Sequence, residues 1–271
     1  MEKLVKILKR CHYTVGRGRS LFLIREQIMK TIRYLFLVVF FSIAISRCSY
    51  FPQNRDVLFQ TSNMNAIFAG VYDGEMGYKE LRRHGDFGIG TFNGIDGELF
   101  GLDGKFYQVK ADGIAYPVID SMKTPFAIVT FFEPDKSILL DKASDYNELQ
   151  GNLDNLLPAK DIFYAIKIEG PFKYIKTRSI PKQNKPYLPF DEAVKTQITF
   201  EFHNVEGTMV GFRCPSYMEG INIAGYHLHF ITKDRKTGGH LLECQMENVK
   251  IEIDYTPEFH MVLPESAKSV E

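Results

Sequence analysis

The stretch HGDFGIGTFNGIDGELFGLDGKFYQV, residues 84–109, decides the fold class of this chain. Apolar and small residues alternate along it, and Asp-Gly pairs stand at 96–97 and 103–104, with another just beyond it at 112–113. Alternation with a period of two is typical of strands with one buried face, and Asp-Gly favours the tight turns of β-hairpins. The stretch therefore predicts a meander of hairpin-connected strands.

Strand patterns also dominate the rest of the chain. Three further stretches alternate or are continuously apolar, at 124–132, 162–180 and 197–214. The last is predicted as a hairpin that turns at Glu206 and Gly207, and a second hairpin followed by a long strand is predicted over 227–255.

Helices are few by the same criteria. One short helix is expected within 61–81, and one surface helix within 144–161, where apolar residues recur at helical intervals before Pro158. The sequence predicts an α+β, β-rich protein of two packed lobes with mixed or antiparallel sheets. We expect an N-terminal lobe over 51–155 and a C-terminal lobe over 156–271.

Composition narrows the class of partner. The chain of 271 residues carries 33 Lys and Arg against 33 Asp and Glu, and nucleic-acid binding needs a clustered surplus of positive charge. We therefore expect no nucleic-acid partner. Its charged fraction of 24% and hydrophobic fraction of 45% exclude a largely disordered chain. The four cysteines lack CxxC spacing, so they indicate neither a zinc knuckle nor a disulfide scaffold.

The segment YLFLVVFFSIAI, residues 34–45, is apolar and follows two basic residues. It is too short to cross about 30 Å of hydrocarbon as a helix, which takes about 20 residues. It matches the apolar region of a secretory signal peptide, and a start at Met29 gives that signal its usual proportions. We expect an N-terminal extension plus signal segment over 1–50, export through 29–48, and no stable membrane span in the mature chain.

An alternative is that this segment is a buried strand or helix of a cytoplasmic protein. The sequence ISRC, which ends at Cys48, only half resembles a lipoprotein cleavage box, because Arg47 stands where a small residue is wanted. A periplasmic, secreted or lipid-anchored protein is favoured, and a cytoplasmic one stays open.

Three histidines carry the clearest chemical pattern. His227 and His229 are two residues apart, so on a strand both imidazoles project from one face. His240 follows after the turn-like TKDRKTGG, which brings a neighbouring strand back alongside. Three histidines on a hairpin would suit a zinc ion with a fourth position open for substrate. A structural pair of strand histidines is the alternative.

The segment GTMVGFRCPSYMEGINIAGYHLHFITKDRKTGGHLL, residues 207–242, closely resembles the metal-binding region of alpha-acetolactate decarboxylases. Further similarities follow in the same order over most of residues 58–264, among them LFQTSNMNAIFAGVYDGEMGYKEL, the meander, TPFAIVTFF and FKYIKTRSIPKQNKPYLPF. Several separate motifs in one order make chance similarity improbable.

The resemblance implies a role for five residues. In this family the histidines of the GYHLHF…GGH motif bind zinc, and here these are His227, His229 and His240. The acidic residue of the DGEL turn, Glu98, is implied to handle metal or protons. The arginine of the KTRS motif, Arg178, is implied to face the substrate carboxylate. By position alone, Glu98 would be a solvated turn carboxylate and Arg178 a surface cation.

The C-terminal tail departs from the family pattern. Family members usually carry a longer tail with a late glutamate that folds back to the metal, and this glutamate has no secure equivalent here. Glu265, Glu271 or a water molecule would take its place. Family habit also suggests a homodimer.

The implied function is a zinc-dependent acetolactate decarboxylase that converts 2-acetolactate to acetoin and carbon dioxide, as in acetoin and butanediol biosynthesis. The metal would act as a Lewis acid that stabilises the enediolate, while Arg178 orients the carboxylate and Glu98 relays the final proton. Two alternatives remain: a zinc hydrolase, although no HExxH helix is present, and a non-catalytic zinc-binding relative.

Overall fold

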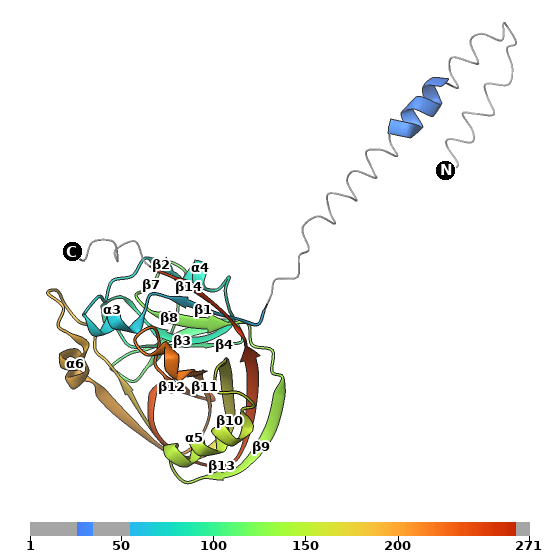
Figure 1. Cartoon of the computed structure of the whole chain (residues 1–271). Coiled ribbons are helices and arrows are strands. Elements are labelled where there is room, and N and C mark those ends of the chain that lie inside the picture. The colour runs from blue at the N-terminus through green and yellow to red at the C-terminus, as the bar shows by residue number, and fades with distance from the viewer. Residues whose placement is uncertain (1–25, 35–54, 264–271) are drawn as a thin grey trace, which may run out of the picture. The chain divides into compact units, whose positions relative to one another are not determined.

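The computed structural model describes residues 26–34 and 55–263 (Figure 1). Residues 26–34 form a helix, and in these two ranges no helix is long and apolar enough to cross a membrane. Most of the expected signal segment, 29–48, lies outside the described residues, as do Glu265 and Glu271. Export and the C-terminal metal ligand therefore stay predictions.

The first main sheet has seven strands. Their spatial order is β14 (Glu258–Val262), β1 (Val57–Thr61), β8 (Ala127–Thr130), β3 (Phe87–Thr91), β4 (Glu98–Leu102), β5 (Lys105–Val109) and β6 (Ala115–Pro117). Neighbours are antiparallel except β14 and β1, which run parallel. Leu102 pairs with Lys105 across Asp103 and Gly104, which both have positive φ. This two-residue turn confirms the predicted meander.

The second main sheet is built from long strands. Its order is β10 (Phe163–Ser179), β11 (Ile198–Cys214), β12 (Gly225–Thr232), β13 (Gly238–Thr256) and β9 (Lys136–Ala143). Because β10 also pairs with β13, the four long strands close into a ring, and β9 adds to β13 (Figure 1). The hairpin predicted over 227–255 is confirmed as β12 and β13.

The hairpin predicted at Glu206 and Gly207 is wrong. Strand β11 continues through both residues, and Gly207 pairs with Gly170 on one side and Thr232 on the other. A Cβ atom at Gly207 would lie 2.5 Å from the ring of Phe230. The glycine therefore permits close packing within the sheet, which leaves the same sequence signature as a turn.

Four short α-helices lie among residues 55–263: α3 (Met64–Phe68), α4 (Tyr78–Leu81), α5 (Tyr146–Leu156) and α6 (Phe190–Ala193). Short 3-10 helices (η1, Asn93–Ile95; η2, Val194–Thr196; η3, Ser216–Met218) and the strand pair β2 (Met76–Gly77) and β7 (Lys123–Thr124) complete the elements. The predicted helix within 144–161 is α5, which Asp145 caps by accepting from the backbone N–H of Glu148. Few helices and mixed and antiparallel sheets confirm the α+β, β-rich class.

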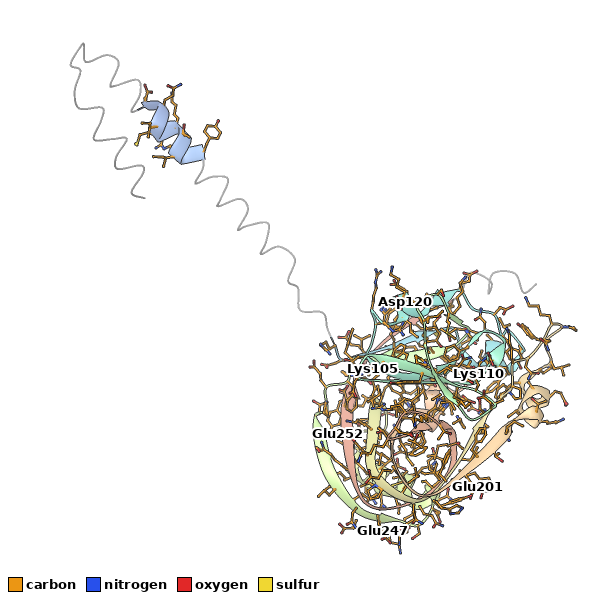
Figure 2. The ribbon with its side chains drawn as sticks, turned by 180° about the vertical axis from the view of Figure 1, so that it is seen from behind. Lys105, Lys110, Asp120, Glu201, Glu247 and Glu252 are labelled. Atoms are coloured by element: carbon orange, nitrogen blue, oxygen red, sulfur yellow. The ribbon has the colours of Figure 1, made fainter. Side chains whose placement is uncertain are left out.

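The two sheets share a buried core. Ile89 and Phe100 of the first sheet pack in one apolar cluster with Phe212 and Ile231 of the second. Figure 2 shows charged side chains around the outside, with Lys105 and Lys110 on the first sheet and Glu247 and Glu252 on the second. Both signs of charge are present on this surface.

The sheets do not follow the chain in sequence. Strand β9 precedes residue 155 and pairs in the second sheet, while β14 lies after it and pairs in the first. The division into lobes over 51–155 and 156–271 stays a prediction.

Candidate active site

The structure brings His227, His229 and His240 together. His229 lies directly opposite His240 in the ladder between β12 and β13, and His227 projects from the same face of β12. Nε2 of His227 lies 3.1 Å from Nδ1 of His240 and 3.2 Å from Nε2 of His229. Three ring nitrogens therefore face one another at short distance.

Hydrogen bonds alone do not explain this arrangement. Nδ1 of His229 lies 2.7 Å from the carbonyl oxygen of Leu99, which only accepts, so in a neutral ring Nε2 of His229 presents a lone pair. His227 can then form a linear hydrogen bond to only one of its two neighbours. Its Nδ1 atom is also buried without a partner. A cation among the three nitrogens would use all three lone pairs.

The spacing fits a metal ion. A tetrahedral zinc with Zn–N bonds of about 2.0–2.1 Å separates its ligand nitrogens by roughly 3.3 Å. Within the described ranges, these three histidines form the one group of three or more His, Cys, Asp or Glu whose ligand atoms lie within 4.8 Å of one another. The donor set, three imidazoles with an open side, suits zinc and similar transition metals.

Burial keeps the three imidazoles neutral. It lowers the pKa of His227 to about 3, with Arg178 adding to the effect. The pKa values of His229 and His240 are lowered well below 6.5, again chiefly by burial. Neutral imidazole is the form that binds a metal, so these residues are ready as ligands at neutral pH.

Arg178 and Glu98 complete the polar side of the site. Arg178 lies opposite His240 in the ladder between β10 and β13, and Glu98 is the first residue of β4. Nη1 of Arg178 donates to Oε1 of Glu98 over 2.8 Å, and the two side chains are 12% and 9% exposed. Oε2 of Glu98 lies 3.6 Å from Nε2 of His229. Neither residue is a surface charge.

The charge of Glu98 is balanced by two opposing effects. Burial raises its pKa above the ordinary value of 4.5, and the Arg178 guanidinium lowers it. The carboxyl is therefore easier to protonate than a solvated glutamate, while it stays within reach of a cation.

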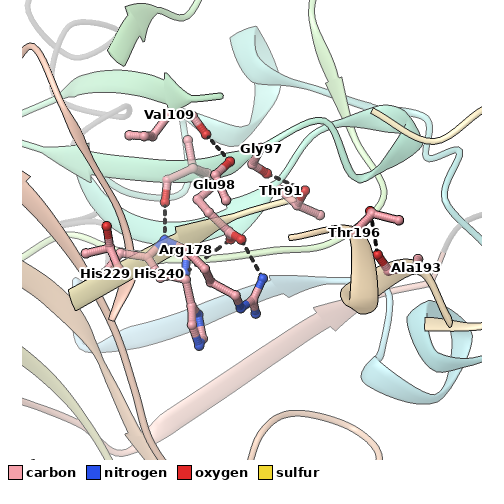
Figure 3. Close-up of polar contacts among 12 residues, drawn as sticks. Thr91, Gly97, Glu98, Val109, Arg178, Ala193, Thr196, His229 and His240 are labelled. Carbon is pink, nitrogen blue, oxygen red and sulfur yellow. Dashed lines mark hydrogen bonds and ion pairs between the residues drawn. The ribbon is translucent and has the colours of Figure 1, made fainter. Parts of the chain in front are cut away.

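Hydrogen bonds between the sheets fix Glu98 beside Arg178 (Figure 3). The backbone N–H of Gly97 donates to the carbonyl of Ile180 over 3.0 Å, and Ser179 Oγ donates to the carbonyl of Val109 over 2.8 Å. Gly97 has φ 81°, and a Cβ atom there would lie 2.3 Å from the Val109 oxygen. The turn before Glu98 thus requires glycine.

A cavity of about 130 Å³ opens beside these groups. Its polar lining consists of Thr91, Glu98, Arg178, His227 and His240, and its buried apolar lining of Met64, Ile67, Ile95, Phe126 and Ile180. Two half-buried side chains, Phe190 and Ile223, also line it. The sequence had not pointed to Thr91 or to the apolar residues as part of a site.

Fold and site together define a β-rich protein with a buried three-histidine group in a cavity, the arrangement of a candidate metalloenzyme. The sequence model of the family described as alpha-acetolactate decarboxylase matches residues 58–270. The chain belongs to the alpha-acetolactate decarboxylase family.

Individual relatives agree with this assignment. The chain is 52% identical over 211 residues to the alpha-acetolactate decarboxylase of Methanosarcina mazei, covering 78% of this chain and 73% of the relative. It is 44% identical over 210 residues to that of Bacillus subtilis, covering 78% and 82%. The crystal structure of alpha-acetolactate decarboxylase from Bacillus subtilis strain 168 superposes with a TM-score of 0.76, covering 78% of this chain and 90% of that one.

Proposed function

We propose that this chain is a zinc-dependent acetolactate decarboxylase, which converts 2-acetolactate to acetoin and carbon dioxide. The observation that carries the proposal is the convergence of three buried, neutral imidazoles beside the Arg178–Glu98 pair, in a chain of this family. His227, His229 and His240 would hold the ion.

The reaction needs an electron sink. When the bond between the carboxylate carbon and C2 breaks, carbon dioxide leaves and the electron pair remains on C2, next to the C3 ketone. Zinc, when bound, supplies a Lewis acid that polarises this ketone. Protonation of C2 then gives acetoin, so one proton replaces the lost carbon dioxide.

Arg178 is placed to bind the substrate carboxylate. Its guanidinium lines the cavity next to His240, and its bond to Glu98 fixes its position. A positioned cation in a site that excludes water stabilises negative charge more strongly than one in water. We assign to Arg178 the orientation of the carboxylate and the stabilisation of charge as it moves onto the substrate oxygens.

Glu98 is placed to move the proton. Oε1 is engaged by Arg178, whereas Oε2 faces the histidines without a hydrogen bond of ordinary length. Because burial raises its pKa, Glu98 can hold a proton near neutral pH and release it to C2.

The test is acetoin formation from racemic 2-acetolactate by the purified chain, before and after chelation of metal. We expect activity that chelation abolishes and zinc restores. A folded, zinc-loaded protein that forms no acetoin would contradict the proposal and favour a non-catalytic zinc-binding relative. Hydrolysis of ester or amide substrates by such a protein would favour the hydrolase alternative.

We also propose that the chain is exported and forms a homodimer. The first proposal rests on the apolar segment within 29–48, and the second on family habit. Edman sequencing of the mature N-terminus distinguishes a start near Cys48, expected for an exported protein, from the start of a cytoplasmic one. Sedimentation analysis gives the number of subunits.

A further inference from the structure

The substituents on C2 of the substrate restrict its orientation. C2 carries a hydroxyl, a carboxylate, an acetyl group and one alkyl group, which is a methyl group in 2-acetolactate. If the hydroxyl and ketone oxygens face the histidines and the carboxylate faces Arg178, the alkyl group points away from all polar groups. It then faces the apolar side of the cavity. This step rests on the proposed function.

The apolar side has a buried floor and a partly exposed rim. Met64, Ile67 and Phe126 are at most 5% exposed and belong to the core between the sheets. Phe190 and Ile223 line the same cavity but are only half-buried, so they lie nearer the solvent. They belong to α6 and to the loop before β12, outside the regular ladders.

The chain holds Phe190 in place. Its ring packs 5.8 Å from the ring of Phe68 on α3. The segment before it is anchored by Asp73, which accepts from the hydroxyl of Tyr187 over 3.0 Å and pairs with Lys185 over 2.6 Å. The position of Phe190 is therefore set by packing and by polar contacts on both sides of the cavity mouth.

Ile223 is fixed by a buried pair of amides. Asn222 donates from Nδ2 to Oε1 of Gln60 over 2.7 Å, and Nε2 of Gln60 donates to the carbonyl of Ile221 over 2.8 Å. Gln60 and Asn222 are 0% and 2% exposed. Satisfied polar groups at such depth hold the loop in one conformation.

We propose that Phe190 and Ile223 form an apolar rim that limits the length of the C2 alkyl group. Methyl fits between the rim and the floor, whereas ethyl and longer groups collide with the rim. The two residues thus determine specificity among 2-acetohydroxy acids, and the Gln60–Asn222 pair acts as a positioning device for Ile223.

The experiment compares kcat/KM for 2-acetolactate with kcat/KM for 2-aceto-2-hydroxybutyrate, which carries an ethyl group. In Phe190→Leu and Ile223→Ala we expect the ratio to shift about 10-fold towards the ethyl substrate, since one methylene is worth roughly that much in an apolar pocket. Ile223→Phe narrows the mouth, so it should shift the ratio the other way. Phe68→Leu is the matched control, because Phe68 contacts Phe190 but is not among the cavity-lining residues.

A binding measurement separates failure of the rim from failure of the proposed function. The unreactive analogues 2,3-dihydroxy-2-methylbutanoate and 2-ethyl-2,3-dihydroxybutanoate are titrated into the zinc-loaded wild type and variants by calorimetry. We expect the ratio of their dissociation constants to shift as the kinetic ratio does. If the wild type forms no acetoin, the proposed function fails, and the binding ratio still decides the rim. Ratios that stay unchanged in all rim variants overturn the inference.

Discussion

The cavity around Glu98 and the region around Asp254 both contain a buried carboxylate, 7% and 1% exposed, in different surroundings. Glu98 pairs with Arg178 over 2.8 Å and lines the cavity. Asp254, fourteen residues beyond His240 on β13, accepts at Oδ2 from the backbone N–H of Glu133 over 3.1 Å. Its charged neighbours include the acidic residues Asp56, Glu133 and Asp135.

The difference separates a buried charge with chemical use from one that only lowers stability. Burial raises the pKa of both carboxyls, but at Glu98 a cation opposes this effect. At Asp254 acidic neighbours add to the effect of burial, and its pKa rises from 3.8 to about 7. We therefore expect substitutions near Glu98 to change the rate, and substitution of Asp254 to change stability.

The largest effect is expected from a metal ligand on the cavity side. His240→Gln should lose bound zinc and reduce acetoin formation by roughly 10³ or more, because the Lewis acid supplies several kcal/mol. Metal analysis and the initial rate are measured on the same sample. His203→Gln, at an exposed position of β11, is the control and should keep both. Full zinc content in His240→Gln would contradict the assigned ligand.

Removal of the cation should come next. Arg178→Ala is expected to lower kcat/KM by about 10²–10³, the usual cost of losing one positioned electrostatic partner. It also leaves Glu98 buried without its cation, so the free energy of unfolding should fall by roughly 3–5 kcal/mol. Lys176→Ala, two residues earlier on β10 in an ion pair with Glu243 that is mostly at the surface, should change neither strongly. Near-normal turnover in Arg178→Ala would refute its role.

A smaller effect on rate is expected when the proton carrier is lost. Glu98→Gln keeps an oxygen that can accept from Arg178 but cannot relay a proton, so the rate should fall by about 10². Zinc content should stay unchanged if Glu98 is not required as a ligand. Asp96→Asn, in the same turn and paired with Lys110, is the matched control. A Glu98→Gln variant with full activity would show that the proton comes from elsewhere.

Asp254→Asn should change stability and not the rate. Below about pH 4 this carboxyl is protonated in the folded and unfolded chains. Between about pH 4 and 7 only the unfolded chain ionises, so the free energy of unfolding of the wild type falls and then levels off. At pH 8 the variant should be more stable by on the order of 1–3 kcal/mol. Urea unfolding at pH 5 and 8 measures this, with exposed Asp141→Asn as control; an unchanged pH slope would refute it.

The polar side of the cavity was largely predictable from sequence. His227, His229 and His240 lie on regular strands, where a period of two and a returning hairpin place them on one face. Glu98 and Arg178 were indicated only by the family resemblance, since a turn carboxylate and a strand cation are ordinary surface residues. Their burial depends on the contact between the sheets.

The apolar side could not be predicted from the same patterns. Met64, Phe126 and Phe190 have the character of core residues, and only the packing of short helices against the sheets leaves a cavity between them. The bond from His229 to the carbonyl of Leu99 has no signature either, because every residue has that carbonyl. At Gly207 the sequence misled, since a glycine required for packing resembles one required for a turn.

A titration of metal-free chain with zinc tests the central claim most directly. Acetoin formation from 2-acetolactate is followed while zinc is added in steps of a fraction of an equivalent. The three-histidine site predicts no activity without metal and a linear rise that stops at one zinc per chain. Full activity in metal-free protein, or one zinc bound per chain with no acetoin formed, would contradict it.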